Sequence, residues 1–138
     1  MSVRSKTIFV IAMVFFMLSG CSNLQRCEQS PEVRLFRTPT EFMVNVGIKS
    51  FEDGNYAGSE MILQNLLDSK NSTKNEKVLA NKYLAFMHCL SPKDEKRQCR
   101  EHFNKIFETN PNFELTPAEA SHPMWGPVFR SAKEKQVK

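Results

Sequence analysis

The chain has 138 residues and a formal net charge of +4, and 41% of its residues are hydrophobic. Two of the basic residues lie in the first 20 positions, and without that segment 17 basic residues stand against 15 acidic ones, a balance that argues against a nucleic-acid-binding surface. This length suits one small domain with a single hydrophobic core.

The N-terminal segment has the parts of a bacterial export signal. Arg4 and Lys6 are basic, residues 7–17 are apolar, and the small pair Ser19-Gly20 precedes Cys21. This arrangement resembles a bacterial lipoprotein signal, in which the segment before the cysteine is removed and Cys21 receives the lipid and becomes the mature N-terminus. The resemblance implies an oxidising, membrane-tethered setting for the rest of the chain.

Two other interpretations of residues 1–20 stay open: an ordinary secretory signal and an uncleaved membrane anchor. Length argues against the anchor, because a helix that crosses a bilayer needs about 20 apolar residues, and polar residues close the shorter run here. Ser22 is not Asp, which by analogy with lipoprotein sorting favours an outer-membrane location facing the periplasm. Two or more acyl chains would make such an anchor stable.

Residues 21–37 are polar and show no helical or strand periodicity, as expected of a tether that holds a domain away from the bilayer. Cys27 lies in this tether. In an oxidising compartment it could stay free or pair with a cysteine of another chain. The folded domain is expected to span residues 38–138.

From residue 38 on, apolar residues recur every three to five positions, which predicts helices throughout. The first helix starts with the capping pattern Thr38-Pro39-Thr40-Glu41 and ends at Asp53-Gly54. Asn55 caps the second helix, whose buried stripe is expected to begin at Tyr56. A polar break over residues 69–73 ends it.

The third helix starts with a capping box, Thr73-Lys74-Asn75-Glu76, and ends at Ser91-Pro92. The fourth helix stops at Asn110-Pro111. No segment shows a sustained alternation of apolar and polar residues, so we predict an all-α fold without a sheet.

The two helix pairs carry positions typical of tetratricopeptide repeats, which are helical hairpins of about 34 residues. Gly47 and Ala85 fall at the small site of the first helix in each pair. The packing positions of the second helices are Ser59, Leu63, Leu66, Cys99, Phe103 and Phe107. An ordinary helical hairpin would show a similar pattern, and two repeats are few for a stack. We expect tetratricopeptide-like hairpins with a C-terminal capping helix.

Cys89 and Cys99 are the expected disulfide, because both fall on apolar faces and flank one short connection. If the fourth helix began at Pro92, their Cα atoms would lie beyond the reach of a disulfide, about 7 Å. The bridge therefore requires a late helix start, near Glu95 or Lys96. A zinc site is disfavoured, because the spacing is not that of a zinc knuckle and the nearby histidines bring no second thiolate pair.

The C-terminal stretch contains a third capping pattern, residues 116–119, which predicts a short helical turn. Pro127 cannot lie deep inside a helix, so the last helix is expected to start between Met124 and Pro127 and to end near Lys135. Trp125 most simply packs over the end of the second pair as a cap. Alternatively it anchors a partner, because Trp is enriched at binding hot spots.

Four stretches in this order carry a family resemblance: 84–89 (LAFMHC), 99–103 (CREHF), 110–115 (NPNFEL) and 117–127 (PAEASHPMWGP). Together with the lipoprotein signal they resemble the TssQ family of type VI secretion system-associated lipoproteins, over about residues 78–129. The resemblance implies a small tetratricopeptide-like periplasmic lipoprotein with an accessory role in the secretion apparatus.

No nucleophile, base and oxyanion constellation is visible in the sequence. Glu119 is used in a helix cap, and His122 beside Pro123 is typical of a turn. We therefore expect a non-enzymatic binding module, without cofactor, metal, nucleic acid or small-molecule substrate, whose partners are proteins of a secretion or envelope complex. Docking is expected on the first helices of each pair. The alternative is a pilotin-like chaperone lipoprotein that binds an outer-membrane secretin or serves another envelope assembly.

Overall fold

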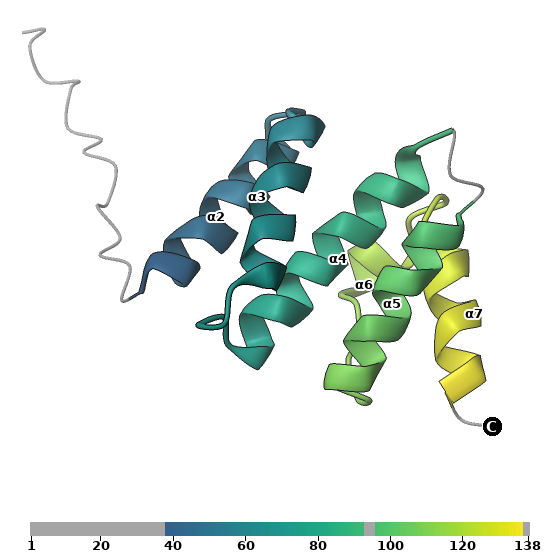
Figure 1. Cartoon of the computed structure of the whole chain (residues 1–138). Coiled ribbons are helices and arrows are strands. Elements are labelled where there is room, and N and C mark those ends of the chain that lie inside the picture. Colours follow the sequence, from purple (N-terminus) through teal and green to yellow (C-terminus); the bar gives the residue numbers. More distant parts are fainter. Residues whose placement is uncertain (1–37, 93–95, 137–138) are drawn as a thin grey trace, which may run out of the picture. The chain divides into compact units, whose positions relative to one another are not determined.

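The computed structural model describes residues 38–92 and 96–136. These residues form helices joined by turns, and no strand occurs among them, which confirms the all-α fold class (Figure 1). None of the helices in these ranges is long and apolar enough to cross a membrane. The predicted signal peptide and tether, with Cys21 and Cys27, lie outside the described residues.

The first hairpin consists of α2 (Pro39–Glu52) and α3 (Tyr56–Asp68). The hydroxyl of Thr38 accepts a hydrogen bond from a backbone amide of the first turn at 3.1 Å, so α2 begins at the predicted cap. Gly54 has a φ of 79°, a left-handed conformation that glycine adopts at little cost. This turn reverses the chain, and the side chain of Asn55 then caps α3 as predicted.

The second hairpin consists of α4 (Lys74–Leu90) and α5 (Arg97–Thr109). The predicted capping box starts α4: Thr73 and Glu76 each accept a hydrogen bond from the backbone amide of the other. α4 ends two residues before Pro92, which would clash with the preceding turn if the helix continued through it.

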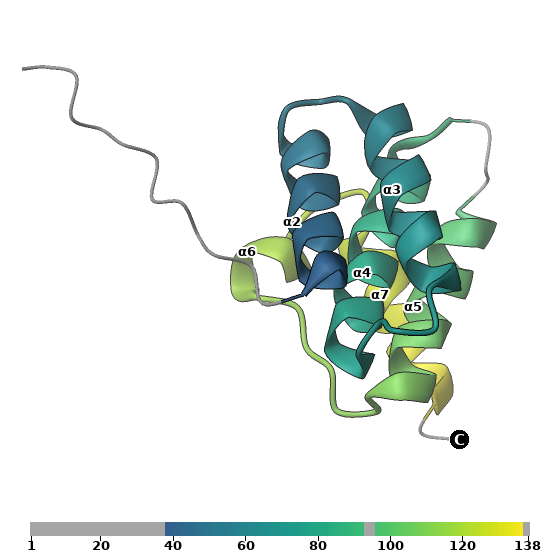
Figure 2. The ribbon, with the colours of Figure 1, turned by 60° about the vertical axis from the view of Figure 1, so that its left-hand side comes forward.

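The chain then crosses over to α6 (Pro117–Ala120) and α7 (Gly126–Gln136). A second complete capping box, between Thr116 and Glu119, starts α6 as predicted. α7 begins inside the predicted window and packs along α5 (Figures 1 and 2). The expected C-terminal capping helix is therefore present.

α4 is the central helix, and it contributes to two hydrophobic clusters. The first cluster joins α4 to α2 and α3 and consists of Val44, Leu63, Leu66, Ala80, Leu84 and Met87. The second joins α4 to α5, α7 and the segment before α7, and consists of Val78, Ala85, Phe86, Cys89, Cys99, Phe103, Ile106, Phe107, Leu115, Trp125, Val128, Phe129 and Ala132. Because α4 faces both clusters, the two hairpins share one continuous packing unit.

The first hairpin depends on a close approach at Gly47. A Cβ atom on this residue would lie 2.6 Å from Cδ2 of Leu63, so only glycine fits without a shift. The approach also lets the buried hydroxyl of Ser59 donate a hydrogen bond to the Gly47 carbonyl at 2.8 Å. The prediction of a small site on the first helix is confirmed at this position.

The second hairpin has the register that a Cys89–Cys99 disulfide needs. Lys96, with a φ of 61°, precedes α5, and the helix starts at Arg97, close to the predicted late start. The Cα atoms of the two cysteines lie 5.1 Å apart, within bonding range, and the disulfide joins them. Both cysteines are buried, so this link lies inside the second cluster.

Candidate functional site

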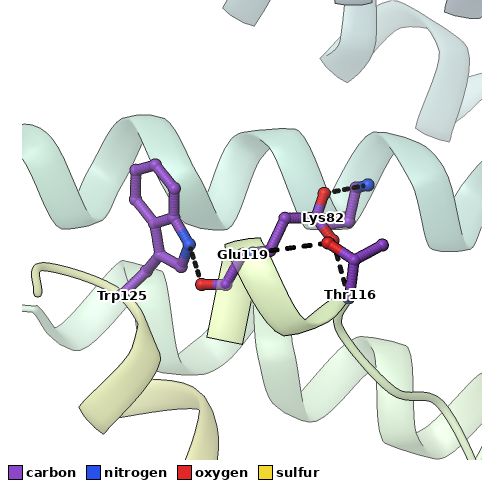
Figure 3. Close-up of polar contacts among 4 residues, drawn as sticks. All are labelled: Lys82, Thr116, Glu119 and Trp125. Carbon is purple, nitrogen blue, oxygen red and sulfur yellow. Dashed lines mark hydrogen bonds and ion pairs between the residues drawn. The ribbon is translucent and has the colours of Figure 1, made fainter. Parts of the chain in front are cut away.

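The C-terminal segment covers the face of α4 that carries Lys82 and Phe86. The carboxylate of Glu119 on α6 accepts hydrogen bonds from the Lys82 ammonium at 2.7 Å and from the Thr116 amide at 3.0 Å (Figure 3). The side chains of Lys82 and Glu119 are 12% and 22% exposed, so this ion pair is partly shielded from water. The Lys82 ammonium also lies 4.7 Å from the centre of the Tyr83 ring.

Trp125 belongs to this covering segment and lies in the core. Its indole stacks on the ring of Phe86 with 4.3 Å between centroids, and its Nε1 donates a hydrogen bond to the Glu119 carbonyl oxygen at 2.9 Å (Figure 3). The residue is 9% exposed. This packing is the one that the cap interpretation of Trp125 expects, and the partner-binding interpretation stays a prediction.

His122 occupies the turn before α7. Its Nδ1 accepts a hydrogen bond from the Met124 amide at 3.2 Å, and its ring stacks on Trp125. Glu114 pairs with Lys133 of α7, whereas Glu119 pairs with Lys82. The two carboxylates of this segment therefore hold different contacts, and His122 is a turn histidine as predicted.

The ion pair at α6 affects the protonation of Glu119. Burial alone would raise the pKa of this carboxyl, but the hydrogen bonds from Lys82 and Thr116 and the Lys82 charge together hold the pKa below its usual value. Burial also raises the pKa of the neighbouring Tyr83 hydroxyl, with a smaller contribution from Glu119. At neutral pH the segment is therefore docked on α4 through an ionised carboxylate.

The expected docking surface on the first helices is thus covered by the chain itself at α4. Glu119 and Trp125 contact Lys82 and Phe86 of α4, which is one of the two first helices on which docking was expected. Among the described residues, the side of the domain formed by the second helices, α3 and α5, is open and hollowed.

One hollow lies where α3, α4 and the start of α5 meet and has a volume of about 550 Å³. Tyr56 of α3 borders it together with Met87 and Leu90 of α4, which gives this end an apolar character. Tyr56 is 47% exposed, so the expectation that it begins the buried stripe of its helix is wrong. Its ring contacts Phe51 across the turn, with 5.5 Å between centroids, and its remaining surface faces the hollow.

A second hollow of about 430 Å³ continues between α3 and α5. Gln98 borders both hollows, so they adjoin along α5. We call the two hollows together the α3–α5 groove. Its walls are Tyr56, Glu60, Gln64 and Asp68 of α3 and Arg97, Gln98, Glu101 and Lys105 of α5.

Two histidines lie in this groove. The rings of His88 and His102 stack with 5.2 Å between centroids and an interplanar angle of 4°. Asn81 donates from its amide nitrogen to the Lys77 carbonyl at 2.8 Å, so its oxygen accepts the hydrogen bond from Nδ1 of His102, also at 2.8 Å. His102 is therefore held in one orientation.

His88 links the floor of the groove to the α3 wall, because its Nε2 lies 3.8 Å from a carboxylate oxygen of Glu60. Within the two described ranges, no three His, Cys, Asp or Glu side chains meet in an arrangement that could hold a metal ion. The groove thus presents amides, imidazoles and charged groups beside an apolar end, with His102 held in one orientation.

The sequence did not reveal this groove. Glu60, Gln64 and Asp68 recur every four residues on α3, a spacing that is also typical of an ordinary solvated helix face. Gln98 and Lys105 look equally ordinary on α5. Tyr56 begins the same face, but it was expected in the buried stripe of its helix and so gave no signal of the groove.

A scan of family models, a search of curated proteins and a search of solved structures each found no significant match to this chain. The resemblance to TssQ lipoproteins therefore stays a prediction from the motifs themselves.

Proposed function

We propose that this chain is a lipid-anchored periplasmic lipoprotein that acts as a non-enzymatic protein-interaction accessory of a type VI secretion system, with the α3–α5 groove as its docking surface. The signal ending at Cys21 supports the anchor, and the motifs between residues 84 and 127 support the secretion role. The main support for the docking role is the groove between α3 and α5. It lies on the domain whose α4 face is already covered by Glu119 and its neighbours.

The groove chemistry supports recognition by side-chain contacts. Its apolar end can bury a large apolar side chain, which is the usual source of affinity at an interface. Its polar part offers hydrogen-bonding groups on two walls, which favour one orientation of a partner over another. The chain would hold a partner segment at the membrane rather than transform a substrate.

The anchor is tested with the substitution Cys21→Ser. We expect the chain to move from the membrane fraction to the soluble periplasmic fraction and to lose incorporation of labelled palmitate, because the lipid-bearing sulfur is gone. Cys27→Ser is the matched control and should stay in the membrane fraction. Unchanged membrane fractionation of the Cys21→Ser chain would remove the anchoring claim.

The partner class is tested by deletion and by affinity purification from membranes. We expect deletion to reduce effector export by the type VI apparatus, and the tagged chain to copurify with components of its membrane complex. Copurification of an outer-membrane secretin, together with retention of that secretin in the inner membrane after deletion, would instead support the pilotin-like alternative.

A further inference from the structure

We infer that the α3–α5 groove receives an amphipathic helix of the partner, with basic side chains toward α3 and acidic side chains toward α5. This inference rests on the proposed docking function and adds the chemistry of the bound segment. It is drawn from the shape of the groove, its apolar end and the charges of its two walls.

The shape of the groove matches a helix. Among the described residues, α3 and α5 both pack on α4 but not on each other, so they form the walls of a trough with α4 between them. α3 has 13 residues, which at about 1.5 Å per residue gives a trough about 20 Å long. A helix of nearly four turns spans that length and completes a four-helix arrangement.

The middle of the trough offers side chains rather than free backbone groups, because its walls and floor there are helices whose amides and carbonyls are paired within each helix. The apolar end is lined by the helix starts at Tyr56 and Gln98 and by residues 91–92. An extended segment that needs a strand edge for its own backbone would find none here. A helix brings its backbone already paired, so it can dock by side chains alone.

The apolar end supplies the anchor. Tyr56 is 47% exposed beside Met87 and Leu90 at this end. Farther along the trough the lining becomes polar, with Gln64 and Gln98 on facing walls. A bound helix should therefore place its largest apolar residue near Tyr56.

The two walls differ in charge. α3 carries Glu60 and Asp68 and no lysine or arginine along its length. On the α5 wall, Arg97 and Lys105 stand against Glu101 alone. The Arg97–Glu101 pair is well exposed and weak, so the wall keeps a basic character. Complementary charges on the two sides of a helix would fix its orientation in the trough.

The occupant is identified by crosslinking in living cells with the full-length, anchored chain. A photoreactive amino acid replaces Gln64 on the α3 wall, and in a second strain it replaces Asn65, an exposed neighbour that does not line the groove. We expect a crosslink from position 64 at least fivefold stronger than from position 65. Sequencing of the crosslinked peptide should show apolar residues at three- and four-residue spacing with basic and acidic residues on opposite flanks.

Charge reversal tests the role of the walls. Asp68→Lys should reduce the crosslink from position 64 about tenfold, because it places a cation against the basic flank of the bound helix. Unfolding should not explain this loss, since a lysine at the last residue of α3 is favourable at a helix C-terminus. Glu108→Lys, the same charge change at an exposed α5 residue outside the groove, should leave the crosslink within twofold.

The outcomes separate this inference from the proposed function. A groove crosslink to an extended or uncharged segment, or to a second copy of this chain, would overturn the inference and leave a docking role standing. An equal effect of Asp68→Lys and Glu108→Lys would overturn the charge argument. Absence of any protein crosslink from either position would overturn both the helix and the groove as the docking surface.

Discussion

The two hairpins bury different kinds of side chain. The first, α2–α3, packs aliphatic residues on α4 and relies on the close approach at Gly47 and on a buried hydrogen bond from Thr40 to Glu76 at 3.1 Å. The second, α4–α5, packs aromatic rings, contains the Cys89–Cys99 link and is covered by α7. Substitutions of aliphatic residues should therefore perturb the packing of the first hairpin on α4, and substitutions of aromatic residues that of the second hairpin.

This difference matches the position of each hairpin in the domain. The second hairpin has a covering helix and a cross-link, and its α5 forms one wall of the groove, whereas α3 of the first hairpin forms the other. Among the described residues, the first hairpin has neither a covering helix nor a cross-link, and it exposes Phe42 and Met61. We expect the first hairpin to open more easily, which native-state hydrogen exchange can measure. Four substitutions test this difference between the hairpins, and the first is expected to cost the most stability.

Phe103→Ala should have the largest effect. Phe103 is fully buried and its ring lies 5.3 Å from Phe129 and 6.4 Å from Phe86, centroid to centroid. Removing the ring should lower the free energy of unfolding by about 3–5 kcal/mol, measured by urea denaturation. Removal of the ring of Phe42, which is 52% exposed, is the control and should cost far less. Equal losses would contradict the importance of the aromatic cluster.

Removal of the disulfide should come next. Replacing Cys89 and Cys99 together by Ala should lower the free energy of unfolding by about 2.5–3 kcal/mol in the loop-entropy description. Hydrogen exchange should accelerate in α4 and α5 more than in α2. In the unreduced parent chain, thiol labelling should leave both cysteines unreactive, and labelling of either one would contradict the link.

Gly47→Ala tests the close approach in the first hairpin. The added methyl would meet Leu63, which is fully buried and cannot swing into solvent. The free energy of unfolding should fall by about 1–3 kcal/mol through overpacking. Combining it with Leu63→Val, which shortens the opposing side chain, should cost less than the sum of the two single changes. If the two losses in unfolding free energy simply add, the contact between residues 47 and 63 is not the source of the strain.

Glu119→Gln should have the smallest effect at pH 7, about 1 kcal/mol. The amide keeps the capping hydrogen bonds but removes the charge that faces Lys82. Because the pKa of Glu119 is lowered in the fold, its ionised form contributes stability above the unfolded pKa, about 4.3, and this contribution is lost as pH falls through the folded pKa.

The difference in unfolding free energy between the parent chain and the Glu119→Gln variant should therefore shrink as pH falls below the unfolded pKa, about 4.3, and vanish below the folded pKa. Urea denaturation at pH 7 and at pH 3.5 measures this convergence. A constant difference between them across this range would mean that the charge of Glu119 does not hold α6 on α4.

Helix starts and stops were the most predictable part of this protein. Three helices begin at a threonine whose hydroxyl accepts a hydrogen bond from the backbone amide three residues later: Thr38, Thr73 and Thr116. Such local bonds depend only on neighbouring residues. The late start of α5 was also predictable, because the reach of a disulfide limits how far apart Cys89 and Cys99 can lie.

The candidate site was not predictable in the same way. Tyr56 was expected in the buried stripe because it is an aromatic residue at a helix start, yet the groove leaves nearly half of it exposed. The filling of the α4 face by Glu119 and Trp125 joins residues about 40 positions apart. No local pattern encodes such a contact.

The amino-acid sequence alone was enough to predict the helix boundaries, the small site at Gly47 and the pairing of Cys89 with Cys99, because capping, steric contact and covalent reach act over short distances along the chain. The fold was needed to show that Trp125 lies in the core, that the C-terminal segment covers α4 and that the described residues leave a space between α3 and α5. These features depend on how three helices pack around α4, and packing is set by contacts between residues far apart in sequence.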